Sequence, residues 1–395
     1  MKLHGKYGMI DPSLFENKNI LVTGSSGLLG SWLVEDLLNM GCNVTGIAID
    51  ETKDDLLKSK NIFDKIEKFY IDVSSYKEIE KIILDKKFTF IFHLAAQTQV
   101  TEALLNPLRT LESNIKGTWN LLEISRLENI PMVLASSDKA YGTSDKLPYQ
   151  ENFALNGEFP YEVSKSASDL ITTMYANTYN INVATLRCGN IYGGGDLNWD
   201  RLIPGVIKHL IIGEIPILRT KGNFKREWVY VKDVVNAYIA TADAVMKNKN
   251  KFIAYNFASG ETKSVMEVYE IISTLVVGKI IKPKIQLDSE FEIKDQQLDS
   301  SRIKNDLGLE SKFTFEESIL EMANIQFQPK HRLLWHYRSK HEELIAFSNH
   351  YVYDNELVIF PSAGAHDDTM GVSLVEVSGK FQRGINPAEA AAMAD

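Results

Sequence analysis

The chain has 395 residues, of which 44% are hydrophobic and 24% are charged, and its formal net charge is −9. This balance excludes a collagen-like, coiled-coil or wholly disordered chain, and the acidic total offers no basic footprint for nucleic acid. No apolar run reaches the roughly 18 residues that span a bilayer, and the N-terminal segment lacks the apolar core of a signal peptide. With only Cys42 and Cys188, no disulfide framework is expected. We therefore predict a cytoplasmic protein that binds neither membrane nor nucleic acid.

The C-terminal segment 331–395 differs in composition from the rest of the chain. It contains five of the eight His residues (331, 336, 341, 350 and 366) but only two Lys. A Lys-rich body joined to a His-rich, Lys-poor end indicates that the two parts of the chain have different origins. The first three of these His are five residues apart and do not share a helix face, so no metal site is predicted.

Short apolar runs alternate with helix-length amphipathic segments along the first 190 residues. The first run, 19–22, stops before a glycine, and apolar residues at helical spacing follow from Leu28 to Met40. Further apolar runs are expected to form strands at 44–49, 68–71, 89–94, 132–135 and 183–186. This alternation predicts an α/β fold with a parallel sheet covered by helices on both faces. From about Asn190 glycines and prolines break the rhythm, which favours a smaller, interleaved region.

A glycine-rich loop lies between the first strand and the first helix. Its candidate cofactor-binding residues are Gly24, Ser26, Gly27, Leu28, Leu29 and Gly30. Glycines let a backbone turn tightly against a pyrophosphate, and a helix N-terminus supplies free N–H groups, although a purely structural turn has the same composition. Asp50 follows the second strand, where a carboxylate binds ribose hydroxyls and repels a 2′-phosphate. Because no Arg occurs between Gly30 and Arg109, we predict NAD rather than NADP, with Asp72 and Val73 near the adenine.

Two short motifs supply groups for proton transfer. Tyr161 and Lys165 share a helix face, and an ammonium beside a phenol favours the phenolate, so we expect a lowered pKa for Tyr161. Ser137, Asp138 and Lys139 follow the strand at 132–135, at the carboxyl end where sites open in doubly wound sheets. Taken alone, the first motif is more typical of a surface helix than of an active site, and the second is also typical of a turn or a helix cap.

In this order, the motifs resemble those of the extended short-chain dehydrogenase/reductases over residues 15–328. The resemblance is carried by the glycine loop, His93 to Gln97, Asn114, Ser137, Tyr161 with Lys165, and Arg187 to Asn190. Within that superfamily, the triplet at 137–139 and the segments 193–196 and 200–204 are similar to nucleotide-sugar 4,6-dehydratases, most of all to the CDP-glucose type. Most such dehydratases have Thr-Asp-Glu at the turn and the CDP-glucose type has Thr-Asp-Lys, so Ser137 departs from both while keeping a hydroxyl.

The resemblance implies a Rossmann-like doubly wound sheet, with an NAD-binding domain over 1–190 that also receives parts of 225–260, and a substrate-binding region over 191–330. It adds Leu94, Ala95 and Ala96, together with Tyr161 and Lys165, to the cofactor site. For the nucleotide sugar it implies Gln97, Asn114, Asn190, Arg201, Leu202, Arg226 and Arg302, with Arg187 as a further candidate for the diphosphate. The base and the sugar stay open. Relatives are commonly homodimers through a helix pair, and a homodimer is expected here.

The implied reaction is an internal redox cycle. Tyr161, assisted by Ser137 and Lys165, takes the proton of the 4-hydroxyl while a hydride passes from C4 to NAD. Lys139, if neutral, removes the C5 proton, and Asp138, if protonated, donates to the departing 6-hydroxyl. The hydride then returns to C6 and gives a 4-keto-6-deoxy sugar. The alternatives are a nucleotide-sugar 4-epimerase, and a catalytically silent protein that binds NAD or nucleic acid.

The segment 331–395 resembles a fragment of the second motor domain of superfamily one DNA helicases, through Tyr337 to Ser339 and Ala346 to Asn349. No Gly-x-x-x-x-Gly-Lys-Ser/Thr loop occurs in the chain, so ATP-driven unwinding is not expected. Asn386 and Pro387 would cap and begin a helix within which the chain stops. We therefore predict an appended, non-functional fragment.

Overall fold

The computed structural model describes residues 12–51, 55–247, 252–286 and 293–326, together with 335–336 and 358–359. The chain divides into two compact units, 1–328 and 329–395. What is described of the second unit is a short parallel pair, β13 (Trp335–His336) beside β14 (Val358–Ile359). The rest of the predicted helicase-like fragment, with four of its five His and the helix after Asn386, lies outside the described residues.

A seven-stranded parallel sheet forms the centre of the first unit, in the order β10-β6-β5-β4-β1-β2-β3. Its strands are β1 (Asn19–Thr23), β2 (Asn43–Ala48), β3 (Glu67–Tyr70), β4 (Phe90–His93), β5 (Met132–Ser137), β6 (Val183–Cys188) and β10 (Ile253–Phe257). The central strands read as continuous apolar runs because both faces of the sheet are covered. The predicted fold class is confirmed.

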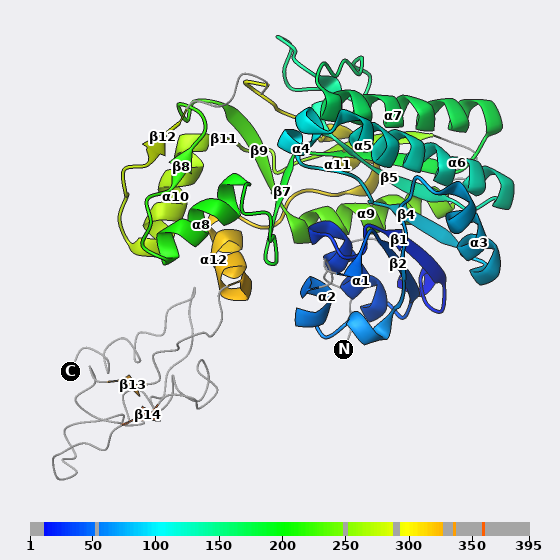
Figure 1. Ribbon diagram of the computed structural model, residues 1–395, viewed down its shortest axis with the longest axis horizontal. Coiled ribbons are helices and arrows are strands. Elements are labelled where there is room, and N and C mark those ends of the chain that lie inside the picture. Colours follow the sequence, from blue (N-terminus) through cyan, green and yellow to red (C-terminus); the bar gives the residue numbers. More distant parts are fainter. Residues whose placement is uncertain are drawn as a thin grey trace, which may run out of the picture. The chain divides into compact units, whose positions relative to one another are not determined.

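Helices pack on both faces of this sheet, as Figure 1 shows. They are α1 (Leu28–Asn39), α2 (Asp55–Ser59), α3 (Tyr76–Lys86), α4 (Val100–Leu105), α5 (Pro107–Leu111), α6 (Gly117–Glu128), α7 (Pro160–Tyr179), α9 (Val231–Lys247) and α11 (Ser301–Leu307). Side chains alternate along β1, so Ile20 and Val22 belong to the core beneath α1 and α9, whereas Leu21 belongs to the core beneath α3 and α6. The sheet therefore has a separate apolar core on each of its two faces.

The strand order reverses direction between β1 and β4, because the chain runs outward through β2 and β3 and then returns to the other side of β1. In open parallel sheets, ligands bind beyond the carboxyl ends of the strands at such a switch point. The glycine loop after β1 and the segment after β4 both lie there.

A smaller region completes the unit. It contains a three-stranded sheet of β7 (Asn190–Tyr192), β9 (Lys225–Tyr230) and β11 (Thr262–Ser264), and the pair β8 (Ile217–Leu218) and β12 (Lys284–Ile285). Its helices are α8 (Leu202–Ile211), α10 (Val265–Val277) and α12 (Phe315–Gln326). Since β9 belongs to the small sheet while the following α9 and β10 complete the large one, the two regions interleave. The division at residue 190 stays a prediction.

Neither a membrane-crossing helix nor a disulfide is found in the described part of the chain: none of its helices is long and apolar enough to cross a bilayer, and both cysteines are free and buried. Burial raises the pKa of Cys42 to about 12, which keeps it a thiol.

His93, the last residue of β4, ties the sheet to α6 beneath the glycine loop. Its Nδ1 lies 2.8 Å from Thr23 Oγ1 and its Nε2 lies 3.2 Å from Thr118 Oγ1. The Thr118 hydroxyl donates to the Asn114 carbonyl, so it accepts from His93, and the imidazole proton is on Nε2. Burial, with a smaller contribution from the Lys165 charge, lowers the pKa of His93 to about 3.

The buried neutral His93 predicts a loss of stability in acid. Below about pH 6.5 the unfolded chain binds a proton at this residue and the native protein does not, so the free energy of unfolding falls as pH decreases, by up to about 1.4 kcal/mol per pH unit. We expect His93→Gln to show a shallower pH dependence between about pH 6.5 and 5 in urea denaturation. His209→Gln, at a half-buried position on α8, is the control and should keep the wild-type slope. Equal slopes for all three proteins would contradict this assignment.

Candidate active site

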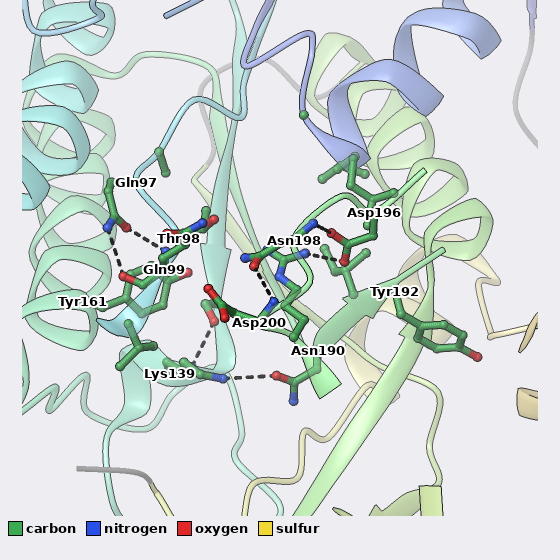
Figure 2. Close-up of a pocket in the computed structure, with 18 of the residues that line it drawn as sticks. Gln97, Thr98, Gln99, Lys139, Tyr161, Asn190, Tyr192, Asp196, Asn198 and Asp200 are labelled. Atoms are coloured by element: carbon green, nitrogen blue, oxygen red, sulfur yellow. Dashed lines mark hydrogen bonds and ion pairs between the residues drawn. The ribbon is translucent and has the colours of Figure 1, made fainter. Parts of the chain in front are cut away.

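A cavity of about 1320 Å³ opens at the carboxyl ends of the central strands and extends into the smaller region. Its walls come from the glycine loop, the ends of β2 to β6, the start of α7, and residues 195–206, 216–220 and 226–228. Figure 2 shows Tyr161, Lys139, Asn190 and the loop of Asp196 and Asn198 around this space. The cavity is therefore built from segments that are widely separated in the sequence.

The glycine loop approaches its neighbours too closely for side chains. Gly24 has φ +72°, and a Cβ placed there would lie 2.8 Å from the Ala95 amide nitrogen. A Cβ on Gly30 would lie 2.0 Å from the Gly24 carbonyl oxygen. The first turn of α1 follows Gly27, which has no side chain to cap it, and contains no acidic residue. Its N–H groups and dipole therefore suit a phosphate group.

The predicted cofactor residues mostly meet on one side of the cavity. Those lining it are Gly24, Ser26, Gly27, Leu28, Leu29, Gly30, Asp72, Val73, Leu94, Ala95, Ala96, Tyr161 and Lys165. Asp50 is the exception: it follows β2 and is half-buried, but Ile49 lines the cavity in its place. We predicted Asp50 from its position in the sequence relative to the glycine loop. The turn after β2 instead brings its neighbour Ile49 to the cavity.

Ser137, Asp138 and Lys139 form a turn at the end of β5. The Ser137 hydroxyl accepts from the Lys139 backbone N–H at 3.2 Å and donates to Asp138 Oδ1 at 2.9 Å. Lys139 Nζ lies 3.7 Å from that carboxylate oxygen. Asp138 is buried, whereas the Lys139 side chain extends across the cavity to Asn190, with Nζ and Oδ1 3.3 Å apart (Figure 2). An acid and a base are thus adjacent at the cavity wall.

Tyr161 and Lys165 lie one turn apart at the start of α7. Lys165 Nζ donates to the Ala135 carbonyl of β5 at 2.9 Å and lies 6.0 Å from the centroid of the Tyr161 ring. Burial raises the pKa of Tyr161 to about 12 and the charge of Asp138 adds to the rise, while Arg201 and a hydrogen bond with Ser137 oppose it. Burial lowers the pKa of Lys165 to about 8. The expected lowering of the Tyr161 pKa is wrong for this structure, because lost hydration outweighs the nearby cations.

Five of the predicted substrate residues line the cavity: Gln97, Asn190, Arg201, Leu202 and Arg226. Arg201 Nη1 pairs with Asp196 Oδ2 at 3.0 Å. Arg226 is buried and its Nη1 donates to the carbonyls of Lys225 and Lys294 at 2.9 and 2.7 Å. Both guanidinium groups are therefore oriented before any ligand binds.

Asn114 was expected at the substrate but does not line the cavity. It is buried in a π-helical turn, Glu112–Lys116. Its Oδ1 accepts from the Gln97 backbone N–H at 2.7 Å, and its Nδ2 donates to the Gln97 carbonyl at 3.0 Å and to Ser164 at 2.9 Å. The amide is used to hold the Gln97 backbone, so the structure corrects its role from contact to support.

Arg187 and Arg302 also lie away from the cavity lining. Arg187 is buried, and its Nε and Nη2 donate to both oxygens of Asp169 at 2.8 and 2.9 Å, so its charge is already paired. Arg302 lies on α11 with 42% of its side chain exposed, beside Asp306 at 3.9 Å. Neither guanidinium is placed to hold a diphosphate in this cavity.

The lining residues that were not anticipated include Arg219, Trp228 and Gln296. Trp228 lies two residues after Arg226 on β9, so strand alternation could have found it once the strand was known. Arg219 pairs with Asp200 at 3.2 Å. Gln296 belongs to a segment without a motif, and no local signal distinguishes it from its neighbour Gln297.

The fold, the glycine loop and the Ser-Tyr-Lys arrangement together define an extended short-chain dehydrogenase/reductase. The GDP-mannose 4,6 dehydratase family model matches residues 21–322. The chain belongs to this family, and the predicted resemblance over its first unit is confirmed.

Two relatives and one solved structure indicate the range of activities among proteins that are similar to this chain. CDP-glucose 4,6-dehydratase of Salmonella typhimurium is 31% identical over 257 residues, which are 62% of this chain and 71% of the relative. A putative UDP-glucose 4-epimerase of Methanocaldococcus jannaschii is 31% identical over 77% of this chain and 97% of the relative. The structure of dTDP-glucose 4,6-dehydratase from Bacillus anthracis in complex with NAD matches with a TM-score of 0.68 and 26% identity, over 78% of this chain and 96% of that one.

Gly30→Ala is expected to abolish dinucleotide binding, because its Cβ would meet the Gly24 carbonyl at 2.0 Å and push the loop away from α1. We expect the affinity for NAD, measured by calorimetry, to fall at least about tenfold, which is about 1.4 kcal/mol. Gly278→Ala, at the end of α10, is the control: a Cβ there meets nothing within 4 Å and the residue does not line the cavity, so its affinity should stay within about threefold of wild type. Unchanged affinity in Gly30→Ala would contradict the assignment of the loop.

Proposed function

We propose that the protein catalyses the NAD-dependent dehydration of a nucleotide-diphosphate hexose to its 4-keto-6-deoxy product, as a CDP-glucose 4,6-dehydratase-like enzyme. The observation that carries this proposal is the adjacent Asp138 and Lys139 on the cavity wall beside Ser137 and Tyr161. Loss of water across C5 and C6 needs a base at one carbon and an acid at the other, and this pair supplies both. The similarity to CDP-glucose 4,6-dehydratase supports the same choice.

The residues present fit NAD. Gly24, Gly27 and Gly30 lack the side chains that would keep a pyrophosphate away from the loop backbone, and Asp72 lines the cavity where an adenosine would extend. Asp72 Oδ1 accepts from the Ser74 backbone N–H at 2.8 Å, which leaves its second oxygen for a ligand. When bound, NAD accepts a hydride from the hexose and returns it to another carbon of the same molecule. Tyr161 and Lys165 would hold its ribose and nicotinamide end.

Asp138 and Lys139 act as an acid–base couple that shares one proton. Transfer of that proton from Lys139 to Asp138 converts an ion pair into a neutral amine and a neutral acid without changing the total charge of the site. The Asp138 side chain is only 3% exposed, and its Oδ1 lies 3.7 Å from Lys139 Nζ, so the acid and the base are neighbours at the cavity wall. The neutral amine removes the C5 proton, and the protonated acid donates to the departing 6-hydroxyl, which leaves as water. When the hydride returns to C6, the Lys139 ammonium gives a proton back to C5, which completes the 4-keto-6-deoxy product.

Tyr161 exchanges the proton of the 4-hydroxyl. Burial raises the pKa of this phenol, and Arg201 and a hydrogen bond with Ser137 partly oppose that rise. Ser137 contacts both Tyr161 and Asp138. Its hydroxyl therefore connects the residue that acts at the 4-hydroxyl with the residue that acts at the 6-hydroxyl. Arg226 and Arg201, oriented by backbone carbonyls and by Asp196, would hold the diphosphate.

A nucleotide-sugar 4-epimerase is the second candidate, favoured by the relative that the chain covers over 97% of its length. An epimerase also oxidises C4 through Tyr161, but it keeps the 6-hydroxyl and has no task for Asp138 and Lys139. Loss of water during turnover separates the two activities.

Lys139→Ala is expected to keep NAD binding and to lose dehydration. We would incubate the wild type with NAD and CDP-, dTDP-, GDP- and UDP-hexoses and detect 4-keto products by mass spectrometry. On the substrate that reacts, Lys139→Ala should lower kcat by about 10² or more, because general base catalysis is worth about 10² to 10⁴. Lys146→Ala, at an exposed position of the following loop, is the control and should retain wild-type turnover. Wild-type turnover in Lys139→Ala would remove this residue from the reaction.

A homodimer is proposed through the outer surface of α5, α6 and α7, which lie side by side in Figure 1. This surface exposes large apolar side chains, including Leu108, Trp119, Leu127, Leu170 and Met174. Exposed apolar patches rimmed by polar residues are typical of protein interfaces. A second copy packing its own α6 and α7 here would bury them.

Leu170→Glu is expected to produce a monomer, because it places a charge in the centre of the proposed interface; Leu170 is 54% exposed. Light scattering after size exclusion would measure the mass. Ile211→Glu replaces a similarly exposed apolar residue on α8 and should leave the dimer intact. A monomeric wild type, or a dimer that survives Leu170→Glu unchanged, would contradict the proposal.

A further inference from the structure

Gln296 lies at the wall of the cavity on a segment that runs beside β9. Its backbone N–H donates to the Lys225 carbonyl at 3.1 Å, and the Lys225 N–H donates to the Lys294 carbonyl at 3.2 Å. The side chain is 1% exposed and lines the cavity. Gln296 is thus fixed to the small sheet by its backbone while its amide faces the site.

The two ends of this amide have different surroundings. Oε1 lies 3.5 Å from Lys139 Nζ, and Asn190 Oδ1 lies 3.3 Å from the same nitrogen. An ammonium only donates, so the amide must turn its oxygen towards Lys139. Its Nε2 then has no hydrogen-bond partner although it is buried. A buried N–H group without a partner is costly, and a ligand oxygen at this position would satisfy it.

The position of Gln296 places that free donor between two functional groups. Arg226 donates to the Lys294 carbonyl on the same segment, so the candidate diphosphate group and Gln296 share one support. On its other side, Gln296 meets the candidate base Lys139. The Gln296 amide thus neighbours the group proposed to bind the diphosphate and the group proposed to react with the hexose.

We propose that Gln296 is a further active-site residue that holds Lys139 through Oε1 and donates a hydrogen bond from Nε2 to an oxygen of the bound hexose. This inference rests on the proposed function for the identity of the ligand. Two neutral amide oxygens, from Gln296 and Asn190, accept from an amine or an ammonium alike. They orient the base without fixing it in the charged state, which a carboxylate at the same position would do.

The proposal is tested with Gln296→Leu and Gln296→Glu, and with Gln297→Leu and Gln297→Glu as matched controls. Gln297 is the half-buried neighbour and does not line the cavity. In Gln296→Leu we expect kcat to fall by about 10²-fold while KM and NAD affinity change less than about threefold, since one preorganised donor is worth about 10² to 10³ in kcat. The control Gln297→Leu should keep wild-type values. Unchanged kcat in Gln296→Leu would overturn the proposal.

Gln296→Glu adds a charge beside Lys139, whose other charged neighbours are Asp138 at 3.7 Å and, further off, Glu162. The new carboxylate stabilises the ammonium, so the pH at which kcat rises should move upward. A merely structural role would leave that pH unchanged. Gln297→Glu should not move the profile.

A readout without substrate separates this inference from the proposed function. Acylation of Lys139 by acetic anhydride, followed by mass spectrometry across a pH series, reports the fraction of free amine. The curve should move to higher pH in Gln296→Glu and not in Gln297→Glu; coincident curves would overturn the contact with Lys139. If the curve moves but no nucleotide sugar reacts with the wild type, the contact stands and the proposed function fails.

Discussion

An acid and a base on consecutive residues, held 3.7 Å apart at the wall of the cavity, are the constraint around which this site is arranged. In water Asp138 and Lys139 would form an ion pair and stay charged. At the wall of the cavity Asp138 is buried, and the Lys139 amine meets two neutral amide oxygens rather than a second carboxylate. The base is therefore oriented by neutral groups beside a buried acid.

The turn that carries this pair is anchored from three directions. The Ser137 side chain caps its start, and Tyr141 at its end donates to Asn256 of β10 at 2.7 Å and accepts from Arg187 of β6 at 2.7 Å. Arg187 is in turn held by both oxygens of Asp169 on α7. Removing one partner of such a buried pair costs roughly 3–5 kcal/mol. Arg187, which was expected to bind the diphosphate, thus links the turn at 137–141 to α7, the helix that bears Tyr161.

Much of the large sheet could be predicted from the sequence, because an apolar run between turn residues reports a buried parallel strand locally. The run at 19–22 is β1, and the spacing of Tyr161 and Lys165 placed both on one face of α7. The glycine loop was equally readable, since Gly24 and Gly30 meet a geometric need that no other residue satisfies. The small sheet was not delineated, because β7 and β11 have only three residues each and because its strands pair across long stretches of chain.

Side-chain roles were harder to predict where they depend on distant partners. Asn114 and Arg187 occupy motif positions, but their side chains already bind other parts of the protein. Asn114 accepts a hydrogen bond from the Gln97 backbone, and Arg187 donates to Asp169. The sign of the Tyr161 pKa shift was missed because spacing shows the nearby ammonium but not the loss of hydration. Gln296 meets Lys139 across 157 residues of sequence, and no local pattern encodes that contact.

The most direct measurement is the mass and proton spectrum of the product formed by the wild type and NAD in heavy water from the nucleotide sugar that reacts. If Asp138 and Lys139 act as acid and base, the product lacks one water and carries one deuterium at C5, taken from the exchanged Lys139 amine. A product that retains its 6-hydroxyl and has hydrogen at C5 would contradict dehydration and establish the epimerase.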